Sequence, residues 1–187
     1  MRIIVYILVG ITLLSCNHQQ REKWISSADS LCITIQNQSH LMDAFPSDSL
    51  QFWTSRIAQK KILIRDLTDT ATWPSLQRTL SPYFNMEKGM INLNDSHKEI
   101  ESIYQQDLKR LMTFRNDLRQ GATADAEGNE INDAYVEKII GLEKAHLDSL
   151  QGQIQNQYEE GILILQQAHW LQPLIDSEIQ KKQALKE

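Results

Sequence analysis

A long apolar stripe within residues 129–171 constrains the fold more strongly than any other feature of the sequence. Its apolar side chains recur at steps of three and four residues, with one interruption at His146, and are Ile131, Tyr135, Ile139, Leu142, Leu150, Ile154, Tyr158, Ile162 and Leu165. This spacing predicts one amphipathic helix, about 60 Å long. Because one short neighbour cannot cover such a stripe, we expect the other segments to align along it in a helical bundle.

Three further segments carry helical patterns. We expect helices over residues 22–41 and 48–68, and a third helix that opens at Ser96 and runs to about residue 119. Between residues 69 and 94 the prolines favour only two short helical turns and a loop. No stretch alternates apolar and polar residues over a length that would favour a strand.

Pro173 sets the expected end of the long helix. A proline ends or kinks a helix, so residues 174–186 are predicted to form a short terminal helix. The predicted fold class is all-α: an elongated antiparallel bundle of about four main helices with short extra helices.

A short polar turn joins the third helix to the long helix. Gly121 ends the third helix, and Asn129 caps the long one. The acidic residues of this turn lack the spacing of an EF-hand loop, so we expect a plain turn. Two long helices with so short a connection form an antiparallel hairpin, which sets the positions near Tyr104 opposite those near His146.

The N-terminal segment has the pattern of a signal peptide. Arg2 precedes twelve residues, 3–14, that are apolar except at Gly10 and Thr12. As a helix these residues span about 18 Å, less than the about 30 Å of a bilayer's hydrocarbon core. We therefore expect an export signal rather than a transmembrane anchor.

The end of this segment, Leu13-Leu14-Ser15-Cys16, resembles the lipobox of bacterial lipoproteins. The resemblance implies that the peptide is cut before Cys16 and that Cys16 becomes an acylated N-terminus. Several acyl chains hold a protein on a membrane. The alternative is an ordinary secretory signal with an incidental cysteine.

The lipobox divides the chain into a signal peptide (1–15), a short tether (16–21) and one helical-bundle domain (22–187). Asn17 follows Cys16, and no acidic run comes directly after it. By the same resemblance, we expect the protein to be anchored to the outer membrane and to face the periplasm.

The composition is acidic. Nineteen Lys and Arg residues stand against 24 Asp and Glu residues, a formal net charge of −5, and no basic patch stands out. We therefore expect no nucleic-acid partner. The one thiol that remains after processing, Cys32, lies among apolar neighbours and is predicted to be a buried core residue rather than a reactive one.

Glu143 and His146 are the candidate residues for a metal-binding or catalytic site. Their Glu-x-x-His spacing is that of carboxylate-bridged di-iron sites in helical bundles. Such a site needs a second motif of this kind, which the sequence lacks, so we expect no metal and no cofactor. In the interpretation without a site, His146 is a neutral side chain that interrupts the apolar stripe.

The sequence thus predicts a lipid-anchored scaffold or adaptor of the cell envelope that binds another envelope protein and is not an enzyme. The alternative is a bundle that binds a ligand or a metal ion, or an enzyme of the same fold. Its site would be built around Glu143 and His146, with Tyr104 and His97 nearby.

The lipobox makes a direct prediction about the mature N-terminus. We expect mass spectrometry of the protein purified from membranes to find a chain that begins at Cys16 and carries acyl chains. An unmodified thiol at the mature start would contradict the predicted anchor.

Overall fold

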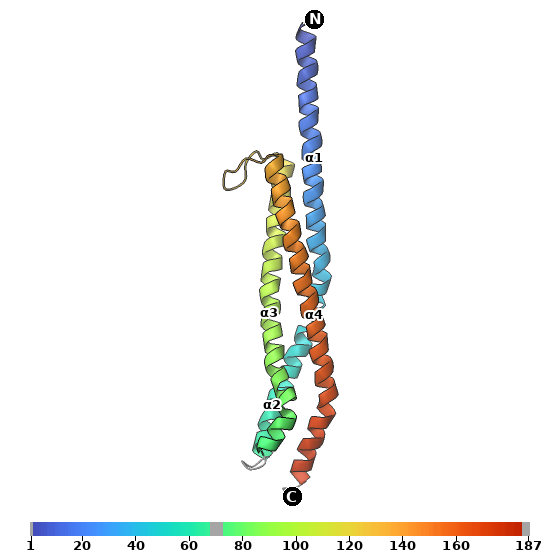
Figure 1. Ribbon diagram of the computed structural model, residues 1–187, viewed down its shortest axis with the longest axis vertical. Helices are drawn as coiled ribbons and strands as arrows, with labels where there is room; N and C mark the ends of the chain where they lie inside the picture. Colours follow the sequence, from blue (N-terminus) through green and yellow to red (C-terminus); the bar gives the residue numbers. More distant parts are fainter. Residues whose placement is uncertain (1, 68–72, 185–187) are drawn as a thin grey trace. The chain divides into compact units, whose positions relative to one another are not determined.

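The computed structural model describes residues 2–67 and 73–184, and the side chains of residues 2–17, 73, 75, 76 and 79 lie outside this description. The described residues form four helices: α1 (Arg2–Asp43), α2 (Ser47–Leu67), α3 (Trp73–Gln120) and α4 (Asp133–Ala184) (Figure 1). The all-α prediction is confirmed, and the helices pack as a bundle.

The predicted signal peptide and the predicted lipidation site, Cys16, lie outside the residues whose side chains are described. Over the described part of the chain, no helix has an apolar stretch long enough to cross a membrane.

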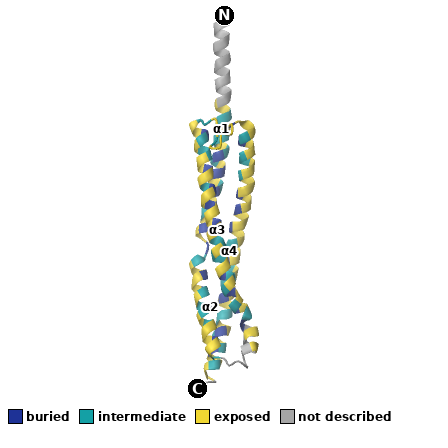
Figure 2. Ribbon diagram, turned by 90° about the vertical axis from the view of Figure 1, so that its left-hand side faces the viewer, coloured by how far each residue is buried: buried dark blue, intermediate teal, exposed yellow. Residues whose placement is uncertain are grey.

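The chain forms two compact units, and α3 and α4 contribute to both. Unit 1 combines Met1–Ser39 with Ser102–Gln151, so α1 packs with the end of α3 and the start of α4. Unit 2 combines His40–Glu101 with Gly152–Glu187, so α2 packs with the start of α3 and the end of α4. Each unit buries its own apolar cluster, seen as dark-blue positions on the facing sides of the helices (Figure 2).

Buried and half-buried positions of α4 follow each other at alternating steps of three and four residues. They are Val136, Ile140, Glu143, Leu147 and Leu150 in unit 1, and Ile154, Gln157, Gly161, Ile164, Ala168, Leu171 and Ile175 in unit 2. The mean step of about 3.5 residues is the period at which side chains of neighbouring helices interlock as knobs in holes. We call this set of positions the inner seam of α4.

The predicted stripe has the right period but the wrong register in its middle. Leu147 is fully buried, whereas Leu142 is 58 % exposed. The inner seam therefore passes through Leu147, and His146 lies beside it rather than interrupting it. The sequence could not choose between Leu142 and Leu147, because apolar residues stand on both sides of the helix. Only the neighbouring helices decide which side is covered.

Residues 69–72 lie outside the described residues, and over residues 73–94 the predicted short turns and loop are wrong, as is the predicted start of the third helix at Ser96. Helix α3 begins at Trp73 and continues without a break, with Pro82 inside it. A proline removes one backbone donor from a helix. Leu80 and Tyr83 on either side of it are each only 1 % exposed, so their burial offsets the lost hydrogen bond.

Helix α4 also passes through a proline, Pro173, and runs on to Ala184, so residues 174–184 are helical as predicted but do not form a separate helix. Residues 185 and 186 of this prediction lie outside the described residues. Ile175 and Ile179, which follow Pro173, belong to the apolar cluster of unit 2 and hold this part of the helix against its neighbours. Packing again outweighs the local cost of the proline.

The first helix also starts earlier than the predicted residue 22. Helix α1 includes Gln20 and Arg21, and the Gln20 amide donates to the Asp133 carboxylate at 2.6 Å. Arg21 donates to the carbonyl oxygen of Ala122 at 3.3 Å. These contacts fasten α1 to both ends of the α3–α4 turn within unit 1.

The predicted hairpin between α3 and α4 is confirmed in unit 1. Gly121 has a φ of +82°, and the backbone N–H of Ala122 donates to the carbonyl of Asp117 at 3.0 Å, so α3 ends in a glycine cap as predicted. Helix α4 starts later than predicted: the side chain of Asn132, not Asn129, accepts the N–H of Tyr135 at 3.0 Å.

Gly161 is a point of close approach in unit 2. A Cβ atom at this position would lie 3.3 Å from Pro46 Cγ and 3.4 Å from Phe45 Cε2, at the turn between α1 and α2. Gly152, on the same helix, would have no heavy atom within 4 Å of an added Cβ. Only the first of these two glycines therefore has a packing reason.

This difference predicts opposite effects of substitution. We expect Gly161→Leu to lower the free energy of unfolding by about 1–3 kcal/mol through overpacking. The matched control, Gly152→Ala, should raise it by about 1 kcal/mol, because alanine favours a helix and meets no neighbour. Urea unfolding measures both, and equal midpoints for the two variants would contradict the role given to Gly161.

Candidate functional site

The two residues singled out by the sequence, Glu143 and His146, lie in unit 1 on the side of α4 that meets α3. His146 Nε2 lies 2.7 Å from Asp107 Oδ2. The Arg110 guanidinium donates to Glu143 Oε2 at 2.7 Å and lies 3.0 Å from Asp107 Oδ1. These four residues form one polar cluster that bridges the two helices, where the predicted hairpin pairing placed His146.

Asp107 and Arg110 are the two members of the polar cluster that sequence reasoning missed. Asp107 is 4 % exposed and stands in the buried series of α3, between Tyr104 and Leu111. Its neighbour Leu108 is the more apolar residue, yet Leu108 is only half-buried. The alternating steps of three and four residues from Tyr104 to Leu111 were the available signal.

The geometry gives Glu143 a cation from the protein itself. A metal ion at this place would need the Glu143 carboxylate as a ligand. The positive charge of Arg110 already pairs with that carboxylate. Within the described residues, no three His, Cys, Asp or Glu side chains are grouped so that they could hold a metal ion. The polar cluster is therefore an ion-pair network between α3 and α4.

The other two residues of the alternative site have different surroundings. Tyr104 is buried in unit 1. His97 belongs to unit 2, where its ring stacks on Phe45 at a centroid distance of 3.9 Å. Burial lowers the pKa of His97, against the opposing effects of Glu101 and of a hydrogen bond with Gln157. His97 thus serves the packing of the α1–α2 turn in unit 2.

Cys32 is buried, as predicted. It is 2 % exposed and forms no disulfide. Burial raises the pKa of the Cys32 thiol, against the lowering effect of Arg115. A protonated thiol in such a place behaves as a small apolar side chain.

A groove of about 720 Å³ runs along α3 and α4 beside the polar cluster in unit 1. Apolar surface comes from Leu111, Phe114 and Ile139, and the remaining lining is polar. The polar and small residues along the groove are Gln106, Lys109, Arg110, Thr113, Asp117, Asp125, Ala126, Glu127, Asn129, Tyr135, Lys138 and Glu143. We call this feature the unit 1 groove.

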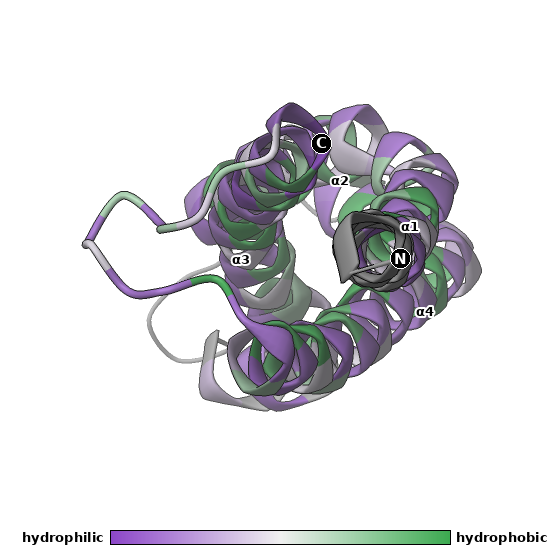
Figure 3. Ribbon diagram, turned by 90° about the horizontal axis from the view of Figure 1, so that it is seen from above, coloured by the Kyte–Doolittle hydropathy of each residue, from purple (hydrophilic) through white to green (hydrophobic). Residues whose placement is uncertain are grey.

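The loop between α3 and α4 closes one end of the unit 1 groove and projects to the side away from α1 (Figure 3). Asp125 holds the loop together. Its carboxylate accepts the N–H groups of Glu127 and Asn129 at 2.9 and 2.8 Å, and the Tyr135 hydroxyl at 2.8 Å. Gly128 provides the positive φ, +88°, that the tight turn requires.

Charges are distributed unevenly along the unit 1 groove. Asp117 and Glu127 lie at the loop end, and Lys109 lies about two helical turns further along α3. The apolar side chains of Phe114 and Ile139 stand between these two regions. Such a surface suits a bound segment with an apolar side chain between a basic and an acidic group.

Comparison with known proteins gives no relative. The chain matches no protein family, no curated protein and no solved structure. A functional assignment therefore rests on the chemistry of the chain's own surfaces.

The loop predicts a pH dependence. Hydrogen bonds, first of all from the Asn129 side chain, lower the pKa of Asp125 from its usual 3.8 to about 2. The ordering effect of the carboxylate is therefore fully present above pH 3.8 and is lost as the pH falls through about 2. We expect the amide proton shifts of Glu127 and Asn129 to titrate in NMR spectra with a midpoint near this lower value.

The variant Tyr135→Phe is the matched control for this titration. It removes one hydrogen bond to the Asp125 carboxylate and should move the midpoint upward. A wild-type midpoint at the ordinary value for aspartate would contradict the loop geometry.

Proposed function

We propose that this protein is a non-catalytic, lipid-anchored scaffold of the bacterial cell envelope that holds another envelope protein in the unit 1 groove. In this proposal the acylated Cys16 is the anchor, on the outer membrane and facing the periplasm, and an elongated antiparallel bundle carries the binding surface away from it. The lipobox-like residues 13–16 support the anchor.

The observation that carries the binding role is the mixed lining of the unit 1 groove. Phe114 and Ile139 offer apolar surface, and Lys109 and Asp117 offer charges of opposite sign at different points along α3. Interfaces between proteins combine an apolar centre with a polar rim in this way. The polar cluster supports the same role, since it fixes α3 against α4 and so keeps the two walls in register.

The groove also describes its partner in chemical terms. A bound segment should place an apolar side chain against Phe114, a basic group near Asp117 and Glu127, and an acidic group near Lys109. A helix or an extended segment of an envelope protein can meet these requirements.

A second candidate function is the binding of a small molecule by the bundle. It is favoured because Glu143 lines the unit 1 groove, whose volume of about 720 Å³ is within the range of ligand pockets. A ligand would then contact Glu143 and Arg110 at the edge of the polar cluster.

Site-specific photo-crosslinking in the native envelope tests the proposed function. We expect a photoreactive residue at Ile139 to capture a defined protein, because this side chain lines the groove. The same photoreactive residue at Ile33, an exposed position of α1 in unit 1, should capture no defined protein. Lys109→Glu should lower the capture by about tenfold or more, whereas Lys144→Glu on the exposed face of α4 should leave it unchanged.

Two outcomes would contradict the scaffold. Equal labelling from Ile139 and Ile33 would mean that the groove binds no protein. Native mass spectrometry that finds a small molecule lost in the Glu143→Ala variant would favour the second candidate instead.

A further inference from the structure

Helix α4 presents an exposed apolar face in unit 2. Leu163, Trp170 and Leu174 are 55, 72 and 53 % exposed. Their spacings of seven and four residues put them on one side of the helix. Large apolar side chains that share one exposed face mark an interaction site more often than single ones do.

These three residues belong to a second periodic series on the same helix. The series alternates steps of four and three residues and runs Asn156, Glu160, Leu163, Gln167, Trp170, Leu174, Ser177 and Lys181. It has the period of the inner seam but lies on a different side, and we call it the outer seam. A helix with two such seams can pack against neighbours on both sides, and the inner seam already uses one of them.

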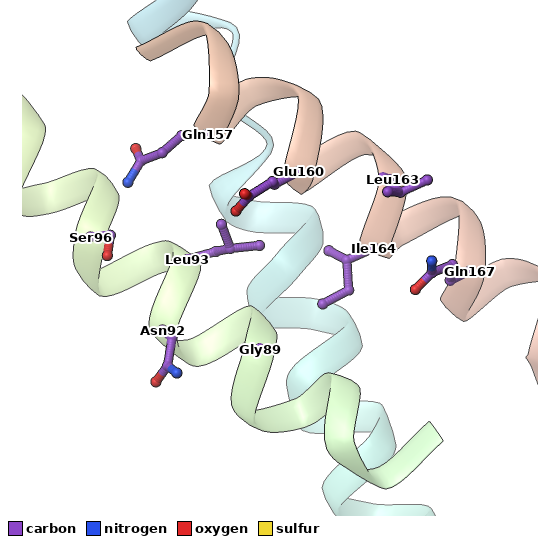
Figure 4. A pocket seen from close by; sticks show the side chains of 9 residues that line it. All are labelled: Gly89, Asn92, Leu93, Ser96, Gln157, Glu160, Leu163, Ile164 and Gln167. Carbon is purple, nitrogen blue, oxygen red and sulfur yellow. The ribbon is translucent and has the colours of Figure 1, made fainter. Parts of the chain in front are cut away.

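The side of α4 that carries the outer seam borders a groove of about 440 Å³ between α3 and α4 (Figure 4). Leu93 and Ile164 point toward one another from the two helices, and α2 passes behind them (Figure 4). The α3 wall offers Gly89, Asn92 and Ser96, which are small or polar. Ile164 Cδ1 lies 3.0 Å from the position of a Cβ added at Gly89, so α4 itself fills the space over this glycine. The open side of the groove lies beside Asn92, Ser96 and the outer seam, where a further helix would take a fourth helix position in unit 2.

We propose that a second copy of this chain occupies this position, with the two α4 helices antiparallel. An alignment that sets Leu163 against Leu174 of the second copy also sets Trp170 beside Gln167 of the second copy. The same contact is then formed twice about a two-fold axis, which closes the assembly as a dimer.

The charges at the two ends of the outer seam favour an antiparallel partner. Glu159 and Glu160 stand before the apolar residues, and Lys181 and Lys182 stand after them together with Glu178, which pairs with Lys181 of the same helix at 2.7 Å. Antiparallel pairing brings the glutamates of each copy within about one helical turn of the lysines of the other. Parallel pairing would place glutamate against glutamate and lysine against lysine.

The dimer is independent of the proposed function. It uses residues of unit 2 alone, whereas the proposed partner binds in unit 1. Failure of the crosslinking at Ile139 would therefore leave the dimer standing, and the reverse also holds.

Disulfide trapping with the full chain in its own membrane tests the dimer and its direction. Two differently tagged versions, Leu163→Cys and Leu174→Cys, are co-expressed in a Cys32→Ala background and oxidised gently. We expect a disulfide between the two versions, and little between two copies of either one alone. Efficient self-crosslinking of each version alone would overturn the antiparallel arrangement, and crosslinking no better than with the exposed Ile62→Cys control on α2 would overturn the dimer.

Charge and apolar variants give a second measurement, by analytical ultracentrifugation of the purified chain. Trp170→Glu should weaken the dimer by about tenfold or more, whereas Ile62→Glu, at another exposed apolar residue of unit 2, should have no effect. Lys181→Glu with Lys182→Glu should also weaken it, and added Glu159→Lys and Glu160→Lys should restore it. A monomeric wild-type chain, or charge variants without rescue, would overturn the proposal.

Discussion

The burial of two matching seams, one on α3 and one on α4, is the constraint on which the rest of the structure depends. On both helices the buried positions alternate at three and four residues, as at Tyr104, Asp107 and Leu111 of α3. A helix can keep one side covered over this length only if its period matches that of its neighbour. This match explains why α3 and α4 run through Pro82 and Pro173, since breaking either helix would expose the seam on one side of the break.

Polar side chains within the seams have a separate role. Asp107 pairs with His146 across unit 1, and Glu143 pairs with Arg110. In unit 1, Gln38 of α1 donates to the backbone carbonyl of Leu147 at 3.2 Å. A purely apolar seam could slide by a turn with little loss, whereas these hydrogen bonds form in one register only. Burying these polar side chains costs free energy, but their hydrogen bonds give the two walls of the unit 1 groove one defined alignment.

Both proposed surfaces have the same physical origin. In the described part of the chain, α1 packs against the pair α3–α4 in unit 1, and α2 packs against it in unit 2. Each pair also has exposed surface, which forms the unit 1 groove in unit 1 and the outer seam in unit 2. Their linings differ, with charges of both signs in the groove and a centre around Trp170 in the outer seam, which is why a foreign protein is proposed for one and a second copy for the other.

The sequence alone determined the helical class, the burial of Cys32 and the hairpin at Gly121, because hydrophobic period and turn chemistry are local properties. It also pointed to Glu143 and His146 as the centre of the alternative site, without their partners Asp107 and Arg110. The tertiary structure decided what local properties leave open. It chose Leu147 over Leu142, and it buried Asp107 beside His146, because the side of a helix that is covered depends on the surfaces that meet it across the bundle.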